Sequence, residues 1–139
     1  MGNIHHDADC AGVNIDDPLI VAEIAAMLDR YDHAIAINDL DALDAMFWRS
    51  DKTLRYGPNG NLYGHAAISA FRRGRNIKGF ERTRGRTVIT TFGDDFAAAD
   101  AEYSRPGFQG VHRQSQTWVR MPEGWRIVSA HVSDFAPVK

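Results

Sequence analysis

The sequence predicts a single α+β domain with three N-terminal helices packed on a curved, mostly antiparallel sheet. The chain has 139 residues, of which 44% are hydrophobic and 24% are charged, and this suits one compact domain. Its first part shows helical periodicity, whereas its second half shows runs rich in Thr, Val and Ile between turn residues. Helices followed by a run of strands favour a layered α+β fold. Three helices on one face of a curved sheet would form a cone with an open mouth.

Each of the three helices has a start signal. The first begins at Asp17 and Pro18, because aspartate caps helices well and proline is tolerated in the first turn. Apolar residues then recur at helical spacing until about Asn38. Asp39 is expected to cap a second, shorter helix, and a third helix follows Gly64.

The strands are predicted from β-branched residues and from the turn residues between them. A short strand is expected at 53–57, before a turn of Pro, Asn and Gly. Four longer strands in a meander are expected at 84–92, 96–104, 114–121 and 125–132, and the last two form a hairpin.

Composition sets the expected compartment and excludes several classes of protein. Residues 1–13 are expected to be a flexible extension, and 14–139 a single domain. The only cysteine is Cys10, so no internal disulfide is possible. Neither a signal peptide nor an apolar run of membrane-spanning length is visible, and we expect a cytoplasmic protein without membrane contact. A net charge of -2 argues against a nucleic-acid partner.

The charges are segregated along the chain. Acidic residues dominate 16–51, whereas arginine and lysine dominate 72–86. Within the second segment, Arg72 and Arg75 share a helical face with apolar residues and are expected at the cavity mouth. Arg73 lies off this face and is expected in solvent. The alternating Arg84 and Arg86 are expected to pair with acids of the first two helices or of a partner subunit.

Several sequence motifs resemble a known superfamily. The segments NLYGH at 61–65, GWRIV at 124–128 and HVS at 131–133 resemble NTF2-like, SnoaL-like proteins. The segments TLRYG at 53–57 and RQSQTWVR at 113–120, with Ala70-Phe71-Arg72, resemble its AtzH-like branch more particularly. The resemblance spans about 15–135, nearly the whole domain.

This resemblance implies a function as well as a fold. It implies a cone-shaped cytoplasmic domain that forms a homodimer through the outer face of its sheet, beside an amidase of the same pathway. The implied activity is that of a decarboxylating amidohydrolase that acts on a carboxylated urea, converting 1,3-dicarboxyurea to allophanate. The implied setting is catabolism of cyanuric acid and s-triazines, or of oxalurate-type nitrogen compounds.

Tyr31 and Arg55 are the predicted catalytic residues. Tyr31 lies on the apolar face of the first helix, so it is either a core tyrosine or a proton donor in the cavity. Arg55 alternates with Leu54 and Tyr56, so it faces either solvent or the cone interior, where it would require an anion. The order of a helical tyrosine and then a strand arginine matches the branch, which favours the functional interpretation of both.

Six further residues are predicted to bind the substrate. They share polar or planar side chains on faces expected to point into the cavity: Arg72, Arg75, Gln114, Gln116, Trp118 and His131. For His131 a structural role is an equally good interpretation. No metal and no cofactor are expected. The ligand is expected to be a small anionic, urea-like molecule.

Charge suggests a mechanism, and two rival functions stay open. Loss of CO2 from a carboxylated urea leaves negative charge on nitrogen, which Arg55 would stabilise while Tyr31 supplies a proton. No nucleophile motif for amide cleavage is visible. The first rival is a non-catalytic module that binds a small acid or an amidase. The second is a ketosteroid-isomerase-like enzyme, for which Asp100 and Glu102 are the carboxylates to examine.

Overall fold

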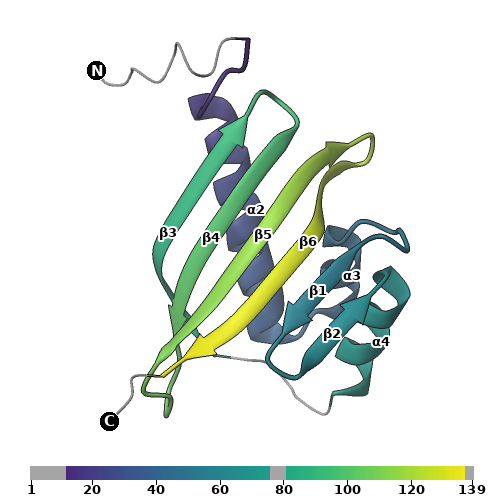
Figure 1. The fold of residues 1–139 in the computed structure, drawn as a ribbon, viewed down its shortest axis with the longest axis vertical. Helices are drawn as coiled ribbons and strands as arrows, with labels where there is room; N and C mark the ends of the chain where they lie inside the picture. The colour runs from purple at the N-terminus through teal and green to yellow at the C-terminus, as the bar shows by residue number, and fades with distance from the viewer. Residues whose placement is uncertain (1–11, 76–80, 137–139) are drawn as a thin grey trace.

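A computed structural model describes residues 12–75 and 81–136 of the chain (Figure 1). The extension predicted at 1–13, with its His5 and His6, lies outside the described residues except for its last two positions. In the part that is described, no helix is long and apolar enough to cross a membrane.

The order of helices and strands is the predicted one with a single strand added. Three helices and six strands follow in the order α2 (Pro18–Ile37), α3 (Leu40–Met46), β1 (Leu54–Gly57), β2 (Gly60–Tyr63), α4 (His65–Gly74), β3 (Thr83–Phe92), β4 (Phe96–Ser104), β5 (Val111–Met121) and β6 (Gly124–Phe135). The predicted α+β class is confirmed. Strand β2 was not predicted, because it occupies only four residues and begins inside the expected turn.

The helix boundaries follow from local hydrogen bonding. The Asp17 carboxylate accepts a bond of 3.0 Å from the backbone N–H of Leu19, which caps α2 at its first turn. Asn38 ends that helix in the left-handed conformation, with φ of 56°. Asp39 then caps α3 by accepting from the backbone N–H of Ala42 at 3.1 Å. All three signals were predicted from the sequence.

The sheet has the strand order β2-β1-β6-β5-β4-β3 and is antiparallel except where β1 runs parallel to β6. Figure 1 shows α2 crossing behind β4 and β5, while α3 and α4 lie behind β1 and β2. All three helices therefore cover one face of the sheet, which we call the inner face. The pairing of β1 with β6 brings Arg55 into the same wall as the C-terminal strand.

The core fills the space between α2 and the inner face. Ile24 and Leu28 are fully buried on the helix, and Trp118 is fully buried on β5. Strand β4 presents small buried side chains to the helix, at Ala97 and Ala99. These alanines let the helix lie close to the sheet, which explains why a strand of poor β-propensity is placed at this position.

A bulge interrupts the alternation of β6. Thr117 pairs with Ser129, but its neighbour Trp118 pairs with Ile127, so Val128 is an extra residue in the strand. Beyond the bulge the inward positions are even-numbered, with Ala130 and Val132 buried. Odd-numbered residues of β6 therefore face inward before the bulge, and even-numbered residues face inward after it.

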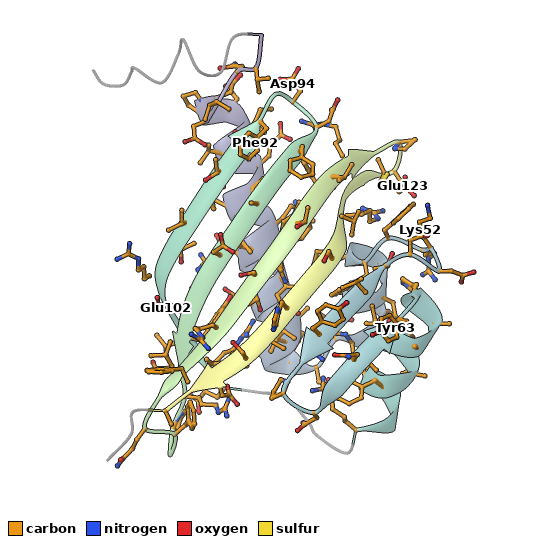
Figure 2. All side chains as sticks on the ribbon, in the orientation of Figure 1. Lys52, Tyr63, Phe92, Asp94, Glu102 and Glu123 are labelled. Carbon is orange, nitrogen blue, oxygen red and sulfur yellow. The ribbon has the colours of Figure 1, made fainter. Side chains whose placement is uncertain are left out.

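The outer face of the sheet carries exposed apolar side chains. Val88, Phe92 and Phe96 are 46%, 39% and 42% exposed on β3 and β4. Figure 2 shows this face toward the viewer, with Phe92 labelled near the β3–β4 turn. The Phe92 and Phe96 rings lie 6.0 Å apart and form an apolar pair that no described helix covers.

Candidate functional site

A cavity of about 340 Å³ opens between the inner face of the sheet and the helices. Side chains from α2, α4, β1, β5 and β6 and from the β1–β2 turn line it. Among the described residues its lining includes five arginines, which are Arg55, Arg72, Arg75, Arg82 and Arg105. A cavity with so many guanidinium groups is suited to an anionic ligand.

Tyr31 lines this cavity and is almost completely buried. It comes from the buried face of α2 and is only 4% exposed. Its hydroxyl accepts a hydrogen bond of 3.3 Å from Nη2 of Arg72. Burial alone would raise the pKa of the Tyr31 phenol, but the positive charges of Arg72, Arg82 and Arg55 outweigh this effect and hold its pKa below the ordinary value. Such a phenol is a better proton donor at neutral pH than an ordinary tyrosine.

Arg55 points into the cavity from β1, which is the orientation that the family resemblance favoured over a solvent-facing one. Its guanidinium carbon lies 5.6 Å from the ring centre of Phe71. Gly57 leaves room for it, because a β-carbon placed on Gly57 would lie 2.9 Å from Nη1 of Arg55. Burial, with Arg72 and the other nearby cations, lowers the pKa of Arg55.

Arg72 and Arg75 enter the cavity from α4 and its C-terminal end. Arg72 is 3% exposed, and its guanidinium carbon lies 5.1 Å from the ring centre of Phe47. Arg75 packs on Phe71 in the same way at 4.9 Å. The aromatic rings hold both guanidinium groups without neutralising them.

The inner arginines, Arg55, Arg72 and Arg75, lack acidic partners in the described part of the chain. No carboxylate oxygen there lies within 4.0 Å of their guanidinium nitrogens. The Nε atoms of Arg72 and Arg75 are also buried without a hydrogen-bond partner among those residues. Buried charges are costly unless they are paired, so the chemistry of this cluster is compatible with an anionic ligand.

Arg82 also lines the cavity, although the sequence reasoning did not single it out. Its Nη2 donates to Asp32 Oδ1 and to Gln114 Oε1, both at 3.1 Å. Its guanidinium carbon lies 3.6 Å from the ring centre of Tyr103 and 5.9 Å from that of Tyr31. No local pattern could have revealed it, since its partners lie far away in sequence.

The cavity rim carries a histidine and an aspartate that were not predicted either. Nδ1 of His112 lies 2.6 Å from Asp134 Oδ1, and Arg105 Nη2 donates to Asp134 Oδ2 at 3.4 Å. Burial lowers the pKa of His112, and the charges of Arg82 and Arg105 act in the same direction, while the bond with Asp134 opposes them. The hydrogen bond with His112 lowers the pKa of Asp134.

Of the three β5 residues that were predicted to bind the substrate, only one lines the cavity. Gln114 lines the cavity, but its amide is engaged by Arg82 and by Tyr103, to whose hydroxyl it donates at 3.3 Å. Gln116 and Trp118 are not in the cavity wall, because both are buried in the core beneath it. Trp118 Nε1 donates to Gln116 Oε1 at 3.2 Å, so the prediction that these two face a ligand is wrong.

The predicted orientation of His131 is also wrong. The bulge at Val128 places His131 on the outer face, where it is exposed and its ring packs edge-on against Tyr56 at 5.8 Å. It shares that face with the carboxylates suggested for an isomerase, Asp100 and Glu102, which are exposed on β4. None of these three side chains lines the cavity.

Two further arginines of the 72–86 segment, Arg84 and Arg73, form ion pairs outside the cavity. Arg84 pairs with Asp29 at 2.7 Å and with Asp32 at 3.1 Å, which confirms the predicted pairing with acids of the first helix. Arg73 pairs with Asp41 and Asp44 on the surface of α3.

Comparison with known proteins identifies relatives for the whole domain. The family model described as AtzH-like matches residues 13–137. A protein of unknown function of the DUF3225 family from Pectobacterium atrosepticum has 47% identity and a TM-score of 0.85, covering 88% of this chain and 95% of that one. A cystatin-like fold protein from Burkholderia xenovorans has 40% identity and a TM-score of 0.86, with 91% and 100% covered.

A more distant match shows the wider superfamily. An NTF2-like superfamily protein from Salmonella enterica has 26% identity and a TM-score of 0.70, covering 88% of this chain and 95% of that one. No curated protein matches the sequence.

Proposed function

The chain belongs to the AtzH-like family of the NTF2-like superfamily, and on this premise we propose that it removes a carboxyl group from a carboxylated urea. The proposed substrate is 1,3-dicarboxyurea and the proposed product is allophanate. The reaction would need no cofactor, and the chemistry would be carried by Tyr31 and Arg55.

One observation carries the proposal. The inner arginines surround a buried tyrosine, and no carboxylate within the described residues offsets their charge. A dicarboxylated urea brings two negative charges and a planar framework, which match flat guanidinium groups in shape and in charge. A neutral apolar ligand would leave all these cations buried and unpaired.

The proposed step uses the charges as follows. The C–N bond to one carboxyl group breaks, CO2 leaves, and the bonding electron pair stays on the urea nitrogen, delocalised into the carbonyl. Arg55 stabilises this developing negative charge. Tyr31 donates its proton to the nitrogen, and the resulting tyrosinate is held by Arg72 until solvent returns a proton. The lowered pKa of Tyr31 favours this transfer.

The isomerase alternative has less support. That chemistry requires an available carboxylate base in the cavity, whereas Asp100 and Glu102 lie on the outer face of the sheet. Asp134 does line the cavity, but His112 and Arg105 engage its carboxylate. The non-catalytic module has the same cavity as the enzyme, and the two functions differ only in turnover.

We also propose that two copies pair through the outer face of the sheet. The exposed Val88, Phe92 and Phe96 form an apolar patch on this face, and such patches mark interaction surfaces. A pathway amidase and a cytoplasmic location complete the proposed setting.

Product analysis tests the function. The wild-type protein is mixed with 13C-labelled 1,3-dicarboxyurea, and the products are followed by NMR. Decarboxylation yields one equivalent of CO2 and one of allophanate. Hydrolysis of a central C–N bond would instead yield one carbamate and one iminodicarboxylate, because the central carbonyl stays on the other nitrogen as a carboxylate. Saturable binding without turnover, together with co-purification of an amidase, would favour the binding module.

A further inference from the structure

Arg82 is fixed from three sides, unlike the inner arginines. Asp32 accepts from its Nη2 on the α2 side, and Gln114 accepts from the same nitrogen on the β5 side. Tyr103 of β4 lies flat beneath its guanidinium group at 3.6 Å. Its side chain is only 6% exposed, and its buried Nε has no partner among the described residues.

The three side chains that hold Arg82 also hold one another. Tyr103 Oη donates to Asp32 Oδ1 at 2.6 Å, and Gln114 Nε2 donates to Tyr103 Oη at 3.3 Å. A closed ring of hydrogen bonds of this kind leaves Arg82 few alternative rotamers. The acceptor in this ring, Asp32, directly follows Tyr31 in α2.

We propose that Asp32 is a positioning residue that holds Arg82 beside Tyr31, and that Arg82 is a fourth cation for the bound anion. This inference rests on the proposed anion pocket. It assigns a role to Asp32 that differs from simple charge compensation. As a positioning residue, Asp32 increases the anion affinity of the pocket even though it is itself negative.

The two roles predict opposite changes in the pKa of Tyr31 and in anion affinity when Asp32 is replaced by asparagine. If Asp32 only offsets charge, Asp32→Asn makes the pocket more positive, which lowers the pKa of Tyr31 and tightens anion binding. If Asp32 positions Arg82, the same change lets the guanidinium group move away from Tyr31. The pKa of Tyr31 then rises and anion binding weakens.

The Tyr31 titration is the first readout, and it requires no catalytic activity. The chain has four tyrosines, so 13Cζ-tyrosine labelling gives four resonances, and Tyr31→Phe identifies the one to follow. The groups that face Tyr31 are Arg72 from α4, Arg55 from β1, Tyr103 from β4 and Arg82. We expect Arg82→Gln to raise the pKa of Tyr31 by about one unit. Asp32→Asn should raise it as well.

Binding of malonate, an inert dianion, is the second readout. We expect Arg82→Gln to weaken malonate binding roughly tenfold. Asp32→Asn should weaken it similarly, and the double variant should bind no worse than Arg82→Gln alone. Arg84→Gln is the matched control, because Arg84 also pairs with Asp32 but does not line the cavity. This control should leave both readouts unchanged.

Three results would overturn the inference. They are a lower Tyr31 pKa with tighter malonate binding in Asp32→Asn, additive losses in the double variant, or an equal effect of Arg84→Gln. Should Asp32→Asn fail to fold, Tyr103→Phe removes the hydroxyl that orients Asp32 and keeps the ring beneath Arg82. If the pKa of Tyr31 changes as expected in these variants but the wild-type protein releases no CO2, the proposed function is refuted and this inference stands.

Discussion

Arg72 donates a hydrogen bond of 3.3 Å to the hydroxyl of Tyr31, and both side chains are almost completely buried. An arginine and a tyrosine in direct contact, with no carboxylate of the described chain paired to that arginine, form an unusual interior. Their contact links the charge of the cavity to the acidity of the phenol. The predictions below follow from this arrangement.

Substitution of Arg72 should abolish anion binding, whereas substitution of its sequence neighbour Arg73 should have little effect. Arg72→Met removes a buried, uncompensated charge, so we expect a more stable protein, by on the order of 1 kcal/mol, that has lost anion binding. Arg73→Met removes a surface ion pair with Asp41 and Asp44, which contributes little. Denaturant unfolding and malonate titration measure the two effects. Equal losses of binding in both variants would mean that net charge alone attracts the anion.

Gly57 should matter because of the space that it leaves for Arg55. In Gly57→Ala the new β-carbon would lie 2.9 Å from Arg55 Nη1, so the flexible guanidinium group must move. We expect weaker malonate binding with a nearly unchanged unfolding midpoint. Gly74→Ala is the control, because a β-carbon there meets no atom within 4 Å. Unchanged binding in Gly57→Ala would show that the position of Arg55 is unimportant.

His112 should make the fold sensitive to mild acid. Burial lowers its pKa below the ordinary 6.5, so the unfolded chain binds a proton more readily than the folded one. The stabilisation is complete above pH 6.5 and is lost as the pH falls through the lowered pKa of folded His112, so unfolding is compared at neutral pH and at mildly acidic pH. In His112→Gln this part of the pH dependence should vanish, whereas the exposed His33→Gln should keep it. Urea unfolding at both pH values tests this, and identical pH slopes for wild type and His112→Gln would contradict it.

The outer face of the sheet should hold the dimer together. Val88→Arg places a charge in the exposed apolar patch, so we expect it to sediment at the chain mass of 15.5 kDa while the wild type sediments at twice that mass. Leu19→Arg alters an even more exposed apolar residue, which lies on α2, and should remain dimeric. A monomeric wild type would refute the pairing.

The fold could be predicted from local periodicity, whereas predicting Tyr31 and Arg55 as site residues also required the resemblance to the AtzH-like family. Alternation in β1 separated Arg55 from its neighbours, helical spacing set Tyr31 and Arg72 on apolar faces, and the family resemblance favoured the cavity for Tyr31 and Arg55, where the structure places all three. Arg82 was missed, since its contacts with Asp32 and Gln114 span 50 and 32 residues. The orientation of His131 was wrong because one bulge residue shifts the alternation of β6, and no residue type marks a bulge of this kind.

Turnover of 1,3-dicarboxyurea by the Tyr31→Phe and Arg55→Ala variants tests the central claim most directly. We expect the rate of CO2 release to fall by roughly a hundredfold or more in each, since one variant removes the proton donor and the other removes the stabilising charge. Arg73→Ala, which alters a surface arginine, should retain the wild-type rate. If both site variants are folded and release CO2 as fast as the wild type, neither residue carries the chemistry.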